Sequence, residues 1–236
     1  MWSLFMVLIF TACEKHEYET AFSVPMNLNP SAEYRVLCLG NSITYHAPNI
    51  NIGWASDWGM AASTAENDYC HQLERLIHNH CSHSTVTGKN ISVWEKDPGI
   101  DFESLIGQDV IDKNIIIIRL GENVTNIDSF QSRLRDLINY CRHQTPNIII
   151  TGCFWYRNNV DKALKQVAIE NNLNYIPLVD IYFENGFNAL NTQEPLCKDT
   201  SGNSYLLTNA FVKRHPGDYG MYLIAKKLHE ILFPSQ

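Results

Sequence analysis

The chain has 236 residues, of which 45% are hydrophobic and 18% are charged. This length and composition are typical of one globular α/β domain with a single core, and they exclude a disordered chain. The net charge is -7, with 25 acidic against 18 basic residues, and the basic residues form no run. Because nucleic acids are bound by clustered Lys and Arg, we expect no nucleic-acid partner.

The amino terminus is almost entirely apolar over residues 1–12, and Cys13 and a polar stretch follow. A transmembrane helix needs about 20 apolar residues, whereas a signal peptide needs fewer. The run ends in Phe-Thr-Ala-Cys, which resembles a bacterial lipobox whose Cys is lipidated after cleavage. We therefore expect a signal peptide with a lipidated Cys13 over 1–13, a tether over 14–32 and a folded domain over 33–236. A buried amino-terminal strand is the alternative.

Apolar runs and amphipathic stretches alternate along the rest of the chain. The pattern predicts strands at 36–39, 89–95, 114–120, 147–154 and 175–179, and helices at 69–80, 127–143, 160–171 and 215–232. Helices that alternate with strands imply right-handed βαβ units and a parallel sheet covered on both faces. The fold class is therefore α/β.

The first predicted strand ends in a polar turn, Gly40-Asn41-Ser42-Ile43-Thr44. A serine just past the carboxyl end of a central parallel strand lies where open α/β sheets bind their ligands. Ser42 is therefore a candidate nucleophile. Asn and Ser are also good helix caps, so the turn alone leaves both interpretations open.

This turn resembles the first sequence block of the SGNH hydrolases, the GDSL-type esterases, with Asn41 where many members have Asp. The resemblance makes Ser42 the nucleophile. A second stretch, Gly121-Glu122-Asn123-Val124, resembles the family's Gly-x-Asn-Asp block, with Val124 in place of the Asp. It implies that the side-chain amide of Asn123 stabilises the oxyanion, although Gly-x-Asn is also common in turns.

The family uses the backbone N–H of a glycine as a further oxyanion donor. Gly59, in Trp-Gly-Met-Ala-Ala-Ser, matches this block best, and Gly53 is the competing candidate. Gly59 precedes a predicted helix, and N–H groups at the start of a helix suit a developing negative charge. With the backbone N–H of Ser42 and the amide of Asn123, Gly59 would form the oxyanion hole.

The stretch Lys-Arg-His-Pro-Gly-Asp-Tyr-Gly-Met, residues 213–221, resembles the His-Pro segment that opens the family's last helix. It implies that His215 is the general base. The family's acid usually lies three residues before this His, and that position is Val212 here. We expect a Ser–His dyad in which a backbone carbonyl fixes the His tautomer, with Asp199 or Asp218 as the alternative third member.

The resemblance covers about residues 34–233. It implies a flavodoxin-like three-layer α/β/α sandwich whose five-stranded parallel sheet has the order 2-1-3-4-5. It also implies an esterase that needs no metal or organic cofactor and acts on a small-molecule or glycan ester. The alternatives are a lipase or thioesterase of the same superfamily and a catalytically inactive glycan-binding protein.

The motifs look closest to exported SGNH esterases of Bacteroidetes, which often accompany glycan-degrading enzymes. This resemblance implies O-acetyl esters on carbohydrate as substrates. It also implies a periplasmic or outer-membrane-anchored lipoprotein of a Gram-negative bacterium, which contacts the membrane only through its lipid. Trp54, Trp58 and Trp155 are candidates for stacking on a sugar ring, and each would equally suit the core.

Overall fold

The structure is a computed structural model that describes residues 18–26, 28, 33–191 and 195–234. The predicted signal peptide and Cys13 lie outside these residues. A five-stranded sheet has the order β2-β1-β3-β4-β5, and every pairing in it is parallel. Its strands β1 to β5 are Arg35–Gly40, Thr85–Asn90, Ile115–Arg119, Ile148–Thr151 and Asn174–Ile176. The predicted fold class and strand order are confirmed.

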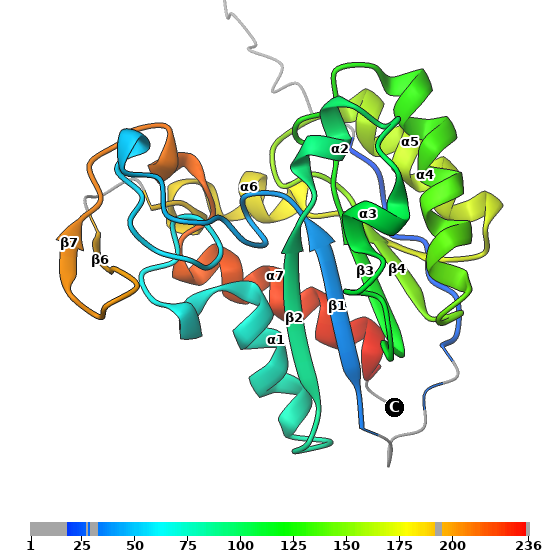
Figure 1. Cartoon of the computed structure of the whole chain (residues 1–236), viewed down its shortest axis with the longest axis horizontal. Coiled ribbons are helices and arrows are strands. Elements are labelled where there is room, and N and C mark those ends of the chain that lie inside the picture. The colour runs from blue at the N-terminus through cyan, green and yellow to red at the C-terminus, as the bar shows by residue number, and fades with distance from the viewer. Residues whose placement is uncertain (1–17, 27, 29–32, 192–194, 235–236) are drawn as a thin grey trace, which may run out of the picture.

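Helices cover both faces of the sheet (Figure 1). One face packs against α1 (Tyr69–His78), α6 (Val179–Asn185) and α7 (Asp218–Leu232). The other packs against α2 (Ser92–Lys96), α3 (Phe102–Ile106), α4 (Ile127–Arg142) and α5 (Asn158–Glu170). Short 3-10 turns are η1 (Ile50–Ile52), η2 (Ala65–Asn67), η3 (Gly186–Ala189) and η4 (Val212–Arg214).

The central strand β3 shows why its sequence is apolar throughout. Ile115 and Ile117 belong to the hydrophobic cluster under α1 and α7, and Ile116 and Ile118 belong to the cluster under α4 and α5. Successive side chains of a strand point to opposite faces, so a strand covered on both sides needs an unbroken apolar run.

The predicted second strand is wrong in position. It was expected over 89–95, but β2 is Thr85–Asn90 and residues 92–96 form α2. As an edge strand, β2 buries only Val86, so it lacks the apolar run of the inner strands. The side chain of Asn90 accepts a hydrogen bond from the backbone N–H of Ser92 at 2.9 Å and turns the chain into α2. Val93 is consequently 56% exposed.

Two segments add to the sandwich. Phe22, within the range expected to be a tether, exchanges backbone hydrogen bonds of 3.0 and 2.8 Å with Tyr175 at the edge of the sheet. Contacts with the domain thus begin upstream of the expected boundary at 33. An antiparallel hairpin of β6 (Leu196–Lys198) and β7 (Ser204–Leu206), which the sequence analysis did not predict, packs beside the loop over 55–63.

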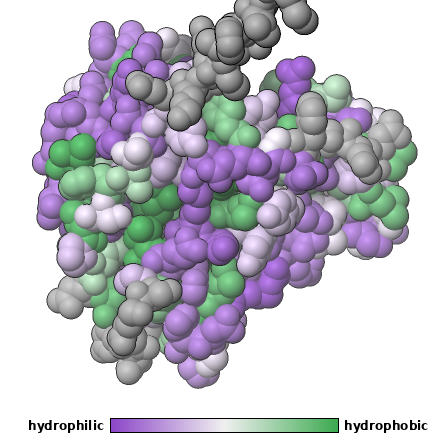
Figure 2. All heavy atoms as spheres, turned by 180° about the vertical axis from the view of Figure 1, so that it is seen from behind, coloured by the Kyte–Doolittle hydropathy of each residue, from purple (hydrophilic) through white to green (hydrophobic). Residues whose placement is uncertain are grey.

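The surface seen from behind is mixed, with apolar areas set between hydrophilic ones (Figure 2). Among the described residues, no helix is both long and apolar enough to cross a membrane. The six cysteines of this part of the chain are all free, and Cys38 and Cys153 are buried in the core.

Candidate active site

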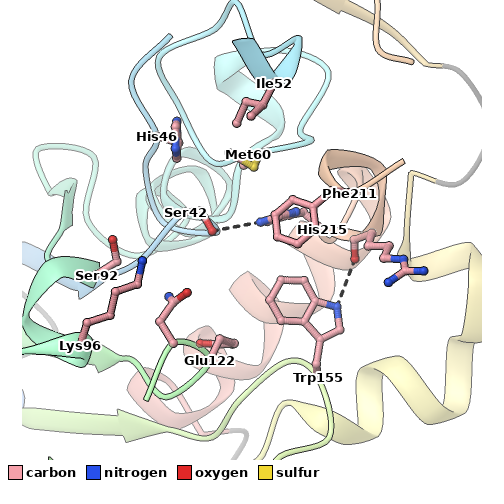
Figure 3. A pocket seen from close by; sticks show the side chains of 12 residues that line it. Ser42, His46, Ile52, Met60, Ser92, Lys96, Glu122, Trp155, Phe211 and His215 are labelled. Carbon is pink, nitrogen blue, oxygen red and sulfur yellow. Dashed lines mark hydrogen bonds between the residues drawn. The ribbon is translucent and has the colours of Figure 1, made fainter. Parts of the chain in front are cut away.

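The candidate site lies at the carboxyl edge of the sheet, where several loops enclose a cavity of about 500 Å³ (Figure 3). Ser42 follows β1, Glu122 and Asn123 follow β3, Trp155 follows β4, and His215 follows η4. The structure thus brings together residues that are far apart in the sequence, at the edge where parallel sheets place their ligands.

Ser42 and His215 are in direct contact. The hydroxyl oxygen Oγ of Ser42 lies 3.0 Å from Nε2 of His215, and Nδ1 of the same ring lies 3.0 Å from the carbonyl oxygen of Val212. A carbonyl can only accept, so Nδ1 carries the proton and the lone pair of Nε2 faces the serine. Burial lowers the pKa of His215 to about 4, so the ring is neutral at pH 7 and able to accept a proton.

The local sequence holds this histidine in place. Pro216 follows it and favours the extended backbone that His215 adopts, with φ -68° and ψ 159°. The side chain of Val212 is fully buried in the core, which anchors η4 and directs its carbonyl at the ring. Val212 thus holds the turn in place through its buried side chain, and its backbone carbonyl accepts the hydrogen bond from Nδ1 of His215.

Neither alternative acid reaches His215. The carboxylate of Asp218 accepts hydrogen bonds from the backbone N–H and hydroxyl of Ser63, both at 2.7 Å, and from the amide of Asn67 at 3.0 Å. The carboxylate of Asp199 accepts from the backbone N–H groups of residues 201 and 203. Both acids stabilise loops.

Two N–H groups of residues that line the cavity are free to donate. The amide Nδ2 of Asn123 donates one hydrogen to Oε2 of Glu95 at 2.7 Å, and its second hydrogen has no partner in the described part of the chain. The backbone N–H of Ser42 also lacks a partner among these residues. Such donors can stabilise an oxyanion that forms on a carbonyl bound to the serine.

The predicted role of Gly59 is not supported by its position. Its N–H donates to the carboxylate of Asp68 at 3.3 Å, and the residue is buried away from the cavity lining. A side chain at this position would bring a Cβ within 2.6 Å of the carbonyl oxygen of Ile43. The glycine thus permits close packing under the Ser42 turn. The N–H of the competing Gly53 donates to Ile50 at 3.0 Å and closes η1.

A buried polar network, which the sequence analysis did not identify, supports the cavity from below. The fully buried Arg119 forms an ion pair with Glu122 and donates to Oδ1 of Asn41 at 2.7 Å. Nδ2 of Asn41 donates to Glu122 at 2.6 Å. The amide of Asn41 accepts from Arg119 and donates to Glu122 at the same time, whereas an ionised Asp at this position could only accept. The sequence feature that could have indicated this network is the pair of charged residues, Arg119 and Glu122, soon after the four isoleucines of β3.

The three tryptophans have different environments. Trp155 lines the cavity, and its ring contacts that of His215 edge to face at a centroid distance of 5.1 Å. Trp54 and Trp58 do not line it and cannot stack on a substrate there. They are 0% and 7% exposed, and their Nε1 atoms donate to backbone carbonyls. Phe211, which the sequence analysis did not single out, lines the cavity and is 69% exposed.

Four further lining residues differ in polarity. Ile52 and Met60 are apolar, whereas Ser92 and Lys96, both from α2, are polar. Ser92 and Lys96 lie beyond Ser42 on the side away from His215 (Figure 3). Within the described residues, no three His, Cys, Asp or Glu side chains are grouped so that they could hold a metal ion.

No protein-family model and no curated protein sequence matches the chain. Solved structures do resemble it. An acetylxylan esterase from Geobacillus stearothermophilus has a TM-score of 0.60 and 15% identity, over 88% of this chain and 98% of that one. A lipase/acylhydrolase from Enterococcus faecalis has a TM-score of 0.56 and 13% identity, over 86% and 99%. A two-domain esterase active on acetylated mannans has a TM-score of 0.55 and 15% identity, over 85% and 49%. At these identities the likeness shows a shared fold.

Proposed function

We propose that the chain is a serine esterase of the SGNH type that removes short acyl groups, O-acetyl above all, from carbohydrate. The observation that carries this proposal is the 3.0 Å contact between Ser42 Oγ and His215 Nε2 in a cavity that Asn123 also lines. The sequence blocks and the fold shared with esterases support it.

The reaction follows from the positions of these groups. Oγ of Ser42 attacks the ester carbonyl carbon while Nε2 of His215 takes the hydroxyl proton. The carbonyl oxygen becomes an oxyanion and accepts hydrogen bonds from the free N–H of Asn123 and the backbone N–H of Ser42. The bond to the alcohol then breaks, and Nε2 returns the proton to the leaving oxygen. A water molecule, deprotonated by His215, hydrolyses the acyl-enzyme in the same way.

The position of His215 orients the substrate. Because Nε2 protonates the leaving alcohol, that alcohol must lie beside the imidazole, which Trp155 and Phe211 flank at centroid distances of 5.1 and 5.9 Å. Two aromatic side chains at this side of the cavity suit the apolar face of a sugar ring. The acyl group then points past Ser42 towards Ser92 and Lys96, where a short acyl group fits better than a long apolar chain.

Ile52 and Met60 favour a second candidate, a lipase of the same superfamily, because they provide an apolar wall for an acyl chain. The two functions differ in their dependence on chain length. An acetylesterase loses activity as the acyl chain grows, whereas a lipase gains it.

The test measures turnover of nitrophenyl esters from acetate to octanoate, together with acetylated xylan and mannan oligosaccharides. We expect hydrolysis of the acetyl esters, a decline beyond about four carbons, and a loss of several orders of magnitude in Ser42→Ala. Ser92→Ala is the matched control, because it removes a cavity hydroxyl that does not contact His215, and it should keep at least about a tenth of the activity. Wild-type protein that hydrolyses no ester would exclude the proposal, and a preference for octanoate would favour the lipase.

A further inference from the structure

We propose that Glu95 is a positioning residue, whose buried carboxylate holds the Asn123 amide so that its second N–H faces the oxyanion. This inference rests on the proposed function. Glu95 comes from α2, the short helix that occupies part of the predicted second strand, and the family blocks recognised in the sequence do not include it.

Glu95 accepts hydrogen bonds from both the backbone and the side chain of Asn123. Oε2 of Glu95 accepts from the side-chain Nδ2 of Asn123 at 2.7 Å, while Oε1 accepts from its backbone N–H at 3.4 Å. Oε1 also accepts from the backbone N–H of Gly121 at 2.5 Å. One carboxylate thus binds the turn after β3 and the side chain that projects from it. Glu95 is 1% exposed, so no solvent competes for these donors.

The surroundings of Glu95 require an acceptor that donates nothing. Asn123, Gly121 and, at 3.5 Å, Nδ2 of Asn41 all present N–H groups to it. A carboxylate satisfies them, whereas a glutamine of the same shape would turn an NH₂ group towards one of these donors. Burial and the nearby Glu122 carboxylate raise the pKa of Glu95, and the hydrogen bonds from Asn123 and Gly121 oppose that rise.

The amide geometry explains why this anchor matters for catalysis. An Asn amide has two hydrogens on one nitrogen, so a fixed acceptor for the first determines the direction of the second. An unanchored Asn on a loop would rotate about its terminal torsion, and the oxyanion donor would have to be ordered during the reaction. A donor that is already in place lowers the barrier without reorganisation. The Arg119–Glu122 ion pair keeps the rest of the network neutral.

The experiment is a double-mutant cycle of Glu95→Gln and Asn123→Ala, with kcat and KM measured on nitrophenyl acetate and folding followed by thermal unfolding. Loss of an oxyanion donor costs about 10²–10³ in kcat, so Asn123→Ala should fall in that range. Glu95→Gln should lower kcat by about tenfold to a hundredfold and leave KM within about twofold. The double variant should lie within about threefold of Asn123→Ala, since Glu95 acts through Asn123.

Asp161→Asn is the matched control, because Asp161 is also buried and accepts a backbone N–H, that of Cys153 at 2.7 Å, away from the cavity. It should leave kcat within about twofold. Glu95→Asp repeats the cycle with the charge retained and covers the case in which Glu95→Gln does not fold. Glu95→Asp should lower kcat less than Glu95→Gln does. In the Asn123→Ala background, Glu95→Asp should again cause no further loss of kcat.

The outcomes separate this inference from the function on which it rests. If the wild type is active and the Glu95 variants lose the same factor in kcat with and without Asn123, Glu95 acts independently of the amide and the inference is wrong. A loss confined to KM would also overturn it. A wild type that hydrolyses no ester and does not react with a fluorophosphonate would overturn both the inference and the proposed function.

Discussion

The carbonyl oxygen of Val212 lies 3.0 Å from Nδ1 of His215, where a catalytic triad would place a carboxylate. A neutral acceptor selects the same tautomer as a carboxylate, so Nε2 still faces Ser42. It offers less stabilisation to the imidazolium, however, and burial therefore lowers the pKa of the ring without an opposing anion in contact.

If the carbonyl of Val212 alone orients the ring, Asp199→Asn and Asp218→Asn should each lower kcat by less than about tenfold, whereas loss of a true triad Asp costs about ten thousandfold. His215→Ala should be far worse than either. Asp218→Asn should also lower the free energy of unfolding by about 1–2 kcal/mol, because it weakens the hydrogen bonds of the Ser63 loop. Kinetics and thermal unfolding of the three variants check this, and a collapse of kcat in a folded Asp variant would identify a displaced third member.

The pH profile should reflect the lowered pKa of His215. The ring accepts a proton only when neutral, so kcat/KM rises with pH through the pKa of the free enzyme and then stays level. With that pKa near 4, the plateau should begin at about pH 5. The measurement is kcat/KM from pH 3.5 to 9. A half-maximal point near 6.5 would instead mean that the imidazole is solvated or paired with an anion.

Much of the fold was predictable because its inner strands are short and apolar on both faces. The four β-branched isoleucines of β3 favour a buried strand, and the spacing of Phe130, Leu134 and Leu137 favours a helix packed on one side. The edge strand β2 lacked this signal, because only Val86 is buried and the apolar pair Ile91 and Val93 follows in the next turn.

The candidate site was predictable where a residue type is tied to its position along a strand or turn. Ser42 and Asn123 lie in the turns after β1 and β3, His215 lies between η4 and α7, and the structure brings all three to one cavity. The role of Gly59 depended on the direction of one N–H, which the packing against Asp68 determines. The burial of Glu95 could likewise not be predicted from the sequence, because a glutamate on a short helix is ordinarily exposed.

Asp161 should make the stability depend on pH in a defined direction. Burial raises its pKa to about 6, from a usual value of 3.8. A raised pKa means that the folded state holds the proton more tightly, so the stabilisation is complete below about pH 4 and is lost as the pH rises through 6. One pKa unit corresponds to about 1.4 kcal/mol, so the loss amounts to about 3 kcal/mol.

Asp161→Asn removes this titration and keeps an oxygen for the N–H of Cys153. The measurement is urea unfolding of both proteins at pH 4, 5, 6 and 7. The free energy of unfolding of the wild type minus that of the variant should fall across this range. A difference that stays constant, or that grows with pH, would contradict the assignment.

Phe211 should contribute to sugar binding and little to the chemistry. It is 69% exposed at the cavity mouth, so Phe211→Ala should leave the fold intact. We expect KM for acetylated xylo-oligosaccharides to rise by about fivefold, because Phe211→Ala loses roughly 1 kcal/mol of contact between its ring and the sugar. The value of kcat/KM for nitrophenyl acetate should stay within about twofold of the wild-type value. Tyr222→Ala, which removes an exposed aromatic ring of α7 outside the cavity, is the control. Equal losses on both substrates would assign Phe211 to the support of His215.

Covalent labelling tests most directly whether Ser42 is a nucleophile that His215 activates. A fluorophosphonate reacts far faster with an activated serine than with an ordinary one, so intact-mass and peptide mass spectrometry should find one adduct per chain, located on Ser42. Ser42→Ala should remain unlabelled, and His215→Ala should react slower by at least about a thousandfold. An adduct that persists in Ser42→Ala, or that maps to another serine in the wild type, would contradict the account.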